Sequence, residues 1–454
     1  MSTCTIVADG RSVGKKTGTV RLGEEFEIYL KVPRRLAATE IELFICSEEG
    51  ERLLRYPMDW CDCVEDLDVF HIAVPTTCVG LYWFHFEADT WYGRQYSYKD
   101  WASVNFSADR DWMTSLQLTV YDRQYSVPEF IRGGLFYQVF VDRFCRGRQT
   151  AWRDDSIKSR YRVCAKDEPF DNVERRSIVV RDDWGGEPVW EPDSYGEILN
   201  NDFFGGNLRG VIDKLPYLEG LGVTCIYLSP IFESYSSHKY DTGDYMKIDA
   251  MFGDEGEFAE LCKLAKKRGI SVILDGVFNH TGADSIYFNK YGIYDGVGAW
   301  QSEESGYRHW YDFEENGEYR SWWGIDTLPA VNKDAAEYHE LLFGENGVIR
   351  KYLRLGAAGW RLDVVDEVPD DFVVELVAAA KAEREDAIVL GEVWEDASNK
   401  IAYGVRRRYF LGEELDSVMN YPWKDAIIEY LKSGDALPLA MSIEEICAHY
   451  PPEV

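Results

Sequence analysis

The chain has 454 residues, with 80 acidic against 49 basic side chains and a formal net charge of −31. This length predicts two or three domains, and the negative charge argues against a nucleic-acid or membrane surface as a partner. The first residues contain no apolar segment like that of a signal peptide, and no apolar run reaches the roughly 18 residues of a membrane helix. The ten cysteines lack the spacing of a zinc site. We therefore expect a cytoplasmic protein with reduced thiols.

Residues 1–125 predict an N-terminal all-β sandwich. Apolar and polar residues alternate over 26–32 and 41–45, and 81–86 is a further apolar run, as is typical of short strands. Several such strands separated by turn residues favour a sandwich. Its aromatic residues suit stacking on sugar rings, as in a carbohydrate-binding module, although packing is the commoner role for any one of them. The aromatic candidates are Trp60, Trp91, Tyr92, Tyr96, Tyr98 and Trp101.

Residues 126–454 predict an α/β domain with parallel strands. Apolar segments of strand length alternate with amphipathic segments of helix length, which favours a TIM-type (β/α)8 barrel. A closed barrel needs eight strands, so we expect a barrel that is incomplete in this chain, with about six β/α units. A polar excursion after the third strand, residues 281–331, predicts an inserted domain B. The six predicted strands cover residues 134–142, 223–228, 270–278, 358–364, 387–393 and 415–419.

Two carboxylates, Asp363 and Glu392, end neighbouring strands of the predicted barrel, at the edge where such barrels place their catalytic groups. Retaining glycosidases need two carboxyl groups about 5–5.5 Å apart, and strands about 4.8 Å apart can supply them. Arg361 points to the same side of its strand as Asp363. We expect it to lower the pKa of Asp363, whereas apolar neighbours raise the pKa of Glu392. A purely structural Arg361–Asp363 ion pair is the alternative.

Four segments carry a resemblance to a known family. Residues 275–280 read DGVFNH, residues 359–363 read GWRLD, and residues 391–394 read GEVW. In this order and spacing they resemble signature segments of the α-amylase family, glycoside hydrolase family 13. Residues 328–332, LPAVN, are similar to a further segment near the end of its domain B. The match spans roughly residues 130–435, and together with the leading sandwich it resembles the neopullulanase and amylopullulanase branch.

This resemblance implies a retaining hydrolase of α-1,4 glucosidic bonds, with α-1,6 bonds as a second candidate linkage, acting on maltodextrins, pullulan or cyclodextrins. It implies that Asp363 is the nucleophile, that Glu392 is the acid/base, and that Arg361 orients Asp363. Asp275 is expected to orient the loop after the third strand rather than to touch sugar. For Asp366 and Glu367 a solvated acidic turn is an equally good interpretation. The implied substrate-binding residues are Arg361, His280, Tyr240, Asp275, His238, Asp366, Glu367 and Trp394.

The chain departs from the family at a third carboxylate, an Asp after a His at the end of the seventh strand. His449 is followed by Tyr450, and no such pair occurs before Val454. We therefore expect these residues to be the front part of a longer protein. The 454-residue chain alone is expected to be inactive, or nearly so, on starch and pullulan, and robust turnover by the purified chain would contradict this.

A second departure concerns calcium, which the branch often binds near the first barrel strand. The matching positions hold Arg146, Arg148 and Asn207. Calcium takes oxygen ligands, which arginine side chains do not supply. We therefore expect the site to be lost and no cofactor to be required.

Two alternatives share these residues. An α-glucan transglycosylase would use the same catalytic pair, because sugar instead of water can capture the glycosyl-enzyme. A non-catalytic glucan-binding protein is the interpretation if the chain is complete. The expected partner is an α-glucan oligo- or polysaccharide, not nucleic acid or a membrane, and the branch resemblance makes a homodimer through the N-terminal domain a candidate.

Overall fold

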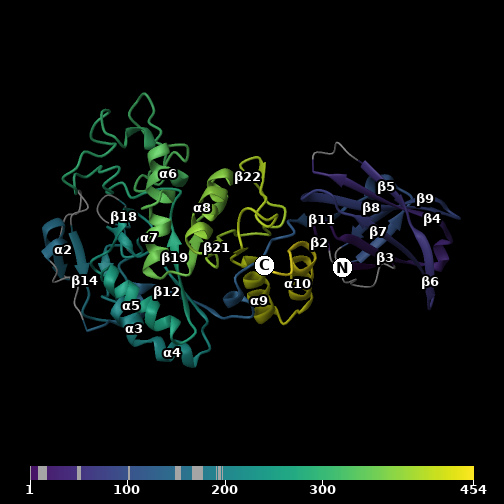
Figure 1. The fold of residues 1–454 in the computed structure, drawn as a ribbon, viewed down its shortest axis with the longest axis horizontal. Coiled ribbons are helices and arrows are strands. Elements are labelled where there is room, and N and C mark those ends of the chain that lie inside the picture. Colours follow the sequence, from purple (N-terminus) through teal and green to yellow (C-terminus); the bar gives the residue numbers. More distant parts are fainter. Residues whose placement is uncertain are drawn as a thin grey trace. The chain divides into compact units, whose positions relative to one another are not determined.

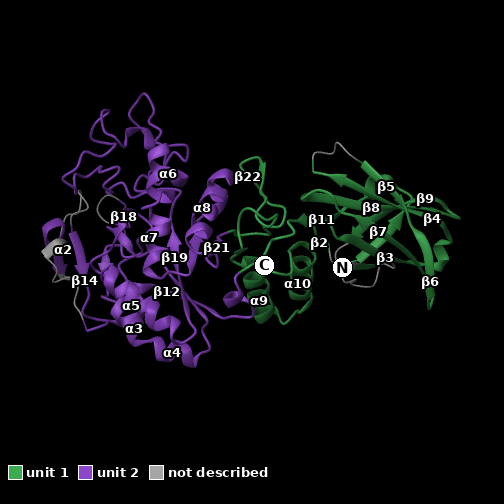
Figure 2. Cartoon of the chain, in the orientation of Figure 1, with its two compact units in different colours: residues 1–127, 393–454 green, residues 128–392 purple. Residues whose placement is uncertain are grey.

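The computed structural model describes residues 2–8, 18–48, 53–100, 103–148, 155–165, 177–190, 192, 196 and 198–454. The chain divides into two compact units, shown in green and purple in Figure 2: residues 1–127 with 393–454, and residues 128–392. Residues 393–454 are grouped with the N-terminal residues by their contacts, and the predicted domain bounds stay a prediction. Trp101, one of the predicted platform aromatics, lies outside the described residues.

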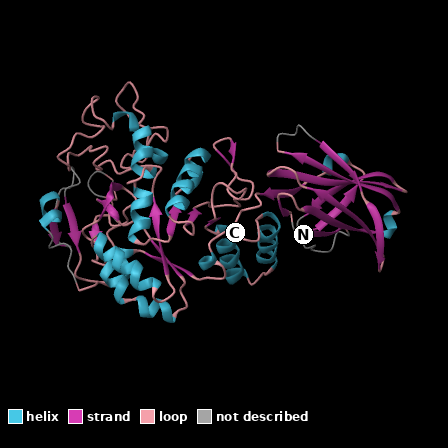
Figure 3. Ribbon diagram, in the orientation of Figure 1, coloured by secondary structure: helices cyan, strands magenta, loops and turns pink. Residues whose placement is uncertain are grey.

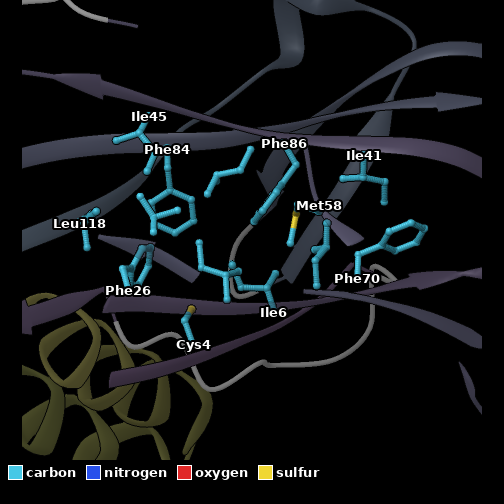
Figure 4. Packing of buried hydrophobic residues seen from close by; sticks show 14 of the residues in the cluster. Cys4, Ile6, Phe26, Ile41, Ile45, Met58, Phe70, Phe84, Phe86 and Leu118 are labelled. Atoms are coloured by element: carbon cyan, nitrogen blue, oxygen red, sulfur yellow. The ribbon is translucent and has the colours of Figure 1, made fainter. Parts of the chain in front are cut away.

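The N-terminal residues form the predicted sandwich of two sheets. Along β3 (Glu25–Pro33) the residues Phe26, Ile28 and Leu30 are fully buried and the residues between them are partly exposed, so one face of the strand points into the core. Figure 4 shows this core, to which strands of both sheets contribute apolar side chains. In strand order, one sheet is β1 (Ser2–Val7), β3, β7 (Leu67–Pro75) and β6 (Asp59–Val64); the other is β10 (Ser103–Ser107), β9 (Gly93–Asp100), β8 (Gly80–Thr90), β11 (Leu116–Tyr121) and β2 (Thr19–Arg21), with β4 (Ala38–Ser47) pairing with β8 and β5 (Leu53–Pro57).

Residues 393–454 join this unit through hydrogen bonds to residues of the N-terminal part of the chain. The amide of Gly18 donates to the carbonyl of Ala448 at 2.8 Å, and the hydroxyl of Tyr125 donates to the carbonyl of Leu415 at 3.0 Å. A Cβ at Gly18 would lie 2.3 Å from the carbonyl oxygen of Gln117. The close approach of Gly18 to Gln117 therefore requires glycine. The segment contains β22 (Ile401–Ala402), β23 (Val405–Arg406), β24 (Ser417–Val418), α9 (Tyr421–Ser433) and α10 (Leu437–His449).

The second unit is built on a parallel sheet. Five strands lie in the order in which they occur along the chain, and every pair of neighbours is parallel. Alternate side chains of neighbouring strands, including Cys225, Ile273 and Ile388, pack in one buried cluster. This is part of a TIM-type barrel, as predicted (Figure 3). The strands are β12 (Phe136–Val139), β16 (Cys225–Leu228), β19 (Ser271–Gly276), β20 (Gly359–Leu362) and β21 (Ile388–Gly391).

Helices alternate with these strands, as Figure 1 shows in teal and green. In α7 (Val348–Leu355) the residues Val348, Ile349, Tyr352 and Leu353 are buried, which is the spacing of one helix face. Gly356 ends the helix in the left-handed conformation at φ 119°. The other helices are α1 (Val141–Phe144), α2 (Asp155–Arg160), α3 (Leu208–Asp213), α4 (Leu215–Gly220), α5 (Glu255–Lys266), α6 (Ala336–Phe343) and α8 (Asp370–Glu383).

The excursion over residues 281–331 connects β19 to α6 with little regular structure. It contains two short 3-10 turns, Arg308–Trp310 and Trp322–Gly324, and isolated bridges such as that between Tyr311 and Val331. Aromatic rings pack within it, including Phe288 against Tyr311 at 4.8 Å. The remaining strands of the unit are β13 (Arg162–Ala165), β14 (Ser177–Val180), β15 (Asp202–Phe203), β17 (Phe232–Ser234) and β18 (Thr242–Ile248).

Two findings bear on the expectations from composition. Within the described residues, no helix combines the length and the hydrophobicity that crossing a membrane requires. All ten cysteines fall in the described part of the chain, and each is a free thiol.

Candidate active site

The predicted site residues lie at the carboxyl ends of three neighbouring parallel strands. In the strand register, Arg361 on β20 is opposite Asp275 on β19, and Leu362 is opposite Gly391 on β21. The amide of Glu392 donates to the carbonyl of Leu362 at 2.9 Å, which continues this register. Asp363 and Glu392, the next residue of each strand, therefore leave the sheet side by side.

The guanidinium of Arg361 joins three carboxylates. Its Nη1 lies 2.8 Å from Oδ1 of Asp275 and 2.8 Å from Oδ1 of Asp363, and its Nη2 lies 2.8 Å from Oε2 of Glu392. All four side chains are buried. One positive charge cannot balance three negative ones, and an unbalanced buried charge is expensive. The cluster therefore favours keeping at least one of its carboxyl groups protonated.

The pKa of Asp363 is raised, although Arg361 was predicted to hold it low and does act in that direction. Burial raises the pKa of Asp363 to about 8, and the charges of Asp275 and Glu392 act in the same direction against Arg361. Burial also raises the pKa of Asp275. The predicted low pKa was wrong because burial outweighs the effect of Arg361, and because the fold makes three carboxylates share that guanidinium. The predicted raised pKa of Glu392 stays a prediction.

Asp275 accepts hydrogen bonds from donors on three different strands or loops. Besides Arg361, it accepts from the hydroxyl of Tyr240 at 3.1 Å and from that of Tyr227. Only 1% of Asp275 is exposed, which agrees with an orienting role. Tyr227 was not predicted, because in the apolar strand β16 it reads as a core residue. Its hydroxyl in an otherwise apolar run was the only available signal.

His280, which follows β19 in the chain, is buried. Burial lowers its pKa to about 3, so the imidazole is neutral at neutral pH. Its ring stacks on Trp322 at 5.4 Å, and no hydrogen-bond partner for Nε2 exists among the described residues. A buried polar atom without a partner is unusual. It agrees with a nitrogen that bonds a ligand, as predicted.

Lys333 supports the loop that carries His280. Its Nζ donates to the backbone carbonyl of Asn279 at 2.7 Å and to Oδ1 of the same residue at 2.6 Å. Burial lowers the pKa of Lys333 to about 7. The sequence offered no signal for this contact, because the two residues are 54 positions apart.

The turn after Asp363 meets the loop at 281–331 through tryptophan. Glu367 accepts from the indole nitrogen of Trp323 at 2.9 Å, and Trp323 stacks on Trp322 at 5.4 Å. Trp323 is 65% exposed. Asp366 lies in the same 3-10 turn, Val365–Glu367, and is half-buried. Trp322 and Trp323 were missed because no motif marked them.

The remaining predicted residues divide into a pair at the site and one outside this unit. The amide of Tyr240 donates to Nδ1 of His238 at 3.1 Å, and their ring centroids are 5.8 Å apart. Trp394 belongs to the other compact unit and is 41% exposed. The structure therefore brings Asp363, Glu392, Arg361, Asp275 and Tyr240 into one bonded cluster. The role predicted for Trp394 stays a prediction.

We infer that the positions that match a calcium site are not suited to a calcium ion. The guanidinium of Arg146 donates to the carbonyls of Phe204 at 2.7 Å and Arg181 at 3.0 Å. Asn207 caps helix α3, with its side-chain oxygen accepting from the amides of Gly147 and Gly210. These oxygens already face N–H donors, whereas calcium needs six to eight oxygen ligands. No cluster of three acidic, His or Cys side chains that could hold a metal occurs among the described residues.

Comparisons with known proteins identify the family. Residues 138–448 match the model of the α-amylase catalytic domain. An amylopullulanase of Thermoanaerobacterium saccharolyticum is 40% identical over 340 residues, which covers 69% of this chain and 25% of that protein. Neopullulanase 2 of Thermoactinomyces vulgaris is 33% identical over 342 residues, covering 73% of this chain and 50% of that protein. A solved cyclomaltodextrinase, 24% identical, shares the fold at a TM-score of 0.58 over 95% of this chain and 67% of its own.

The chain therefore belongs to the α-amylase family. The resemblance drawn from residues 275–280, 359–363 and 391–394 is confirmed, and the relatives support the neopullulanase-like branch. The chain spans a quarter to a half of the length of these two curated relatives.

The shared guanidinium predicts a pH-dependent stability effect of Asp363→Asn. Because the folded-state pKa of Asp363 is raised to about 8, the free energy of unfolding falls as pH rises from about 4 to about 8. Asn cannot ionise, so D363N should melt at least about 2 °C above the natural protein at pH 8.5, and the gap should shrink towards pH 5. Thermal unfolding over this pH range measures it. The matched control is D366N, and a D363N variant that is destabilised at pH 8.5 would contradict the prediction.

The Arg146 contacts predict stability without calcium. EDTA should leave the Tm unchanged and added calcium should not raise it. R146A leaves two carbonyls without their donor, at about 1–3 kcal/mol each when buried, so its Tm should fall by several degrees and calcium should not restore it. R148A, at an exposed neighbour, is the control. A fall in Tm on chelation, reversed by calcium, would overturn the prediction.

Proposed function

We propose that this chain carries the catalytic pair of a retaining α-glucan hydrolase. Its substrates would be maltodextrins, pullulan or cyclodextrins, and it would cleave α-1,4 glucosidic bonds, with α-1,6 bonds as the second candidate. The observation that carries the proposal is the placement of Asp363 and Glu392 at adjacent strand ends on one guanidinium, in a chain of the α-amylase family. Two carboxyl groups at close range are what retaining glycosidases use.

In the first step, an oxygen of Asp363 bonds to the anomeric carbon while the glycosidic carbon–oxygen bond breaks. Glu392 gives its proton to the departing oxygen, so the leaving sugar ends with a free hydroxyl. In the second step Glu392 takes a proton from water, whose oxygen displaces Asp363 from the anomeric carbon. Two displacements at one carbon return the original α configuration.

These two reaction steps require one proton among the carboxyl groups around Arg361. Glu392 must hold this proton, and Asp363 must be ionised. The buried charge balance around Arg361 favours such a proton. Burial raises the pKa of Asp363, so in the ligand-free site the carboxyl groups around Arg361 share the proton. We propose that Glu392 holds this proton in the reacting complex, because the positive charge that develops on the sugar in the transition state favours the ionised form of Asp363.

The substrate would be held by groups around this pair. The free Nε2 of His280 can bond a sugar hydroxyl, and a neutral imidazole can do so as donor or acceptor. The face of Tyr240 and the exposed ring of Trp323 suit stacking on sugar rings. Glu367, which fixes the indole of Trp323, and its neighbour Asp366 would face the leaving-group side.

The ten cysteines are free thiols, which fits a protein of an intracellular, reducing compartment.

Replacing the catalytic pair tests the proposal. In the full-length protein, E392Q should lower kcat by about 10²–10⁴-fold, and D363N should leave no measurable turnover of maltoheptaose. E345Q, at an exposed residue that bonds Arg354, should keep full activity. Circular dichroism and Tm show that each variant is folded. Activity near that of the natural protein in either catalytic variant would refute the assignment.

The products separate hydrolysis from transfer. Proton NMR of the first products should show the α anomer, since a double displacement retains configuration. With maltotriose as the substrate, a hydrolase gives maltose and glucose, whereas longer oligosaccharides at early times would show that transglycosylation dominates. A β anomer as the first product would contradict the retaining mechanism.

A further inference from the structure

Lys239 lies between two predicted substrate-binding residues, yet its own side chain is completely buried. It is 0% exposed, which is rare for lysine. Its backbone has φ +66°, a left-handed conformation that costs free energy for residues other than glycine. A strained residue with a buried charge needs surroundings that hold it in place.

The ammonium group of Lys239 is held in place by polar and aromatic contacts. Its Nζ lies 2.7 Å from Oδ2 of Asp249 and donates to the carbonyl of Ser234 at 3.0 Å. The rings of Phe203 and Phe252 lie 4.7 and 5.2 Å from Nζ, within the range of cation–π attraction. The ammonium is therefore paired with a carboxylate, a carbonyl and two rings.

The acceptor end of this contact is itself fixed. Oδ2 of Asp249 accepts from the amide of Ser234 at 3.1 Å, and its Oδ1 accepts from the amide of Met251 at 2.8 Å. The turn around Lys239 is closed as well. Its amide donates to Oγ of Ser236 at 3.0 Å, and Ser236 in turn bonds the side chain of Asp241. Both ends of the lysine are thus attached to ordered backbone.

The consequence lies on either side of Lys239. With this residue left-handed, the rings of His238 and Tyr240 stand 5.8 Å apart, and the amide of Tyr240 reaches Nδ1 of His238. The hydroxyl of Tyr240 then meets Asp275, which accepts from Arg361. The buried ammonium is the anchor at the middle of a segment whose two flanking rings belong to the site.

We propose that Lys239 is a positioning residue, which holds His238 and Tyr240 in the geometry that binds the sugar. It acts through these two neighbours and does not touch the substrate. This inference rests on the proposed function, because it needs an α-glucan ligand at the site. The alternative is that the Lys239–Asp249 pair only stabilises the fold, and many buried ion pairs can be replaced by apolar residues without harm to structure.

A double-mutant cycle with Tyr240 separates the two roles. The probe is acarbose, a maltooligosaccharide mimic, with Kd measured by calorimetry and Tm measured alongside. K239A should weaken binding at least tenfold. In a Y240A background the same change should have little further effect, because the ring that Lys239 positions is gone. Equal losses in both backgrounds, or no loss in either, would overturn the proposal.

Two further variants separate the anchor from the backbone conformation and from simple unfolding. K239G removes the anchor but adopts the left-handed conformation freely, so it should bind as weakly as K239A while losing less Tm; binding like that of the natural protein would refute the anchor. If K239A does not fold, K239M/D249N keeps the volume without an unpaired buried charge, and it should show the same loss of affinity.

The matched control is K351A. Lys351 also meets a carboxylate, Glu255, and a carbonyl, Met246, but from a regular helix that carries none of the predicted site residues. It should lose Tm and keep acarbose affinity, and a tenfold loss of affinity there would overturn the specificity claimed for Lys239. If the natural protein itself does not bind acarbose, the proposed function fails. If the natural protein binds acarbose, and the K239A and K239G variants bind it as tightly as the natural protein does, only the positioning role fails.

Discussion

The sharing of one guanidinium by three carboxylates is the constraint on which the candidate site depends. Arg361 is buried among Asp275, Asp363 and Glu392, which come from three neighbouring strands in register. The arrangement fixes the positions of the two proposed catalytic groups. It also leaves too much negative charge in a buried place, so that a proton is retained. A site that holds a proton between two carboxyl groups is suited to a reaction that needs one acid and one nucleophile.

The surrounding structure keeps this unfavourable arrangement in place. Val364, directly after Asp363, has φ +40°, which is unusual for a β-branched residue, and its amide donates to Glu392 at 3.1 Å. Lys239 is left-handed as well and flanks the rings of His238 and Tyr240. Backbone strain of this kind persists only where neighbouring contacts outweigh it, and it gathers at functional sites. Of the eight non-glycine residues with positive φ in the described part of the chain, Val364 and Lys239 directly flank proposed site residues.

Much of the fold and of the candidate site could be predicted from the sequence, because both depend on local apolar patterns. Parallel strands covered on both faces are continuous apolar runs, so β16, β19 and β20 could be placed, and their carboxyl ends then located Asp363 and Glu392. The pKa of Asp363 could not be predicted, because it depends on strand register and on burial. The burial of Lys239 and its left-handed backbone could not be predicted either, because nothing in the sequence marks a lysine that has a positive φ. The bonds of residues 393–454 to residues such as Gly18 could not be predicted, because strand and helix periodicity is local whereas these partners are distant in sequence.

The most direct test of the account is to trap the covalent intermediate on Asp363. Treatment of the full-length protein with 5-fluoro-α-D-glucosyl fluoride should release fluoride and leave the fluoroglucosyl group bonded to the nucleophile. The ring fluorine slows both steps, whereas the good leaving group speeds only the first, so the covalent intermediate accumulates. Peptide mass spectrometry should find one modified residue, Asp363, and no label in D363N. A label on Asp275, on Glu392 or on any other residue, or hydrolysis of α-glucan without a trappable intermediate, would contradict the account.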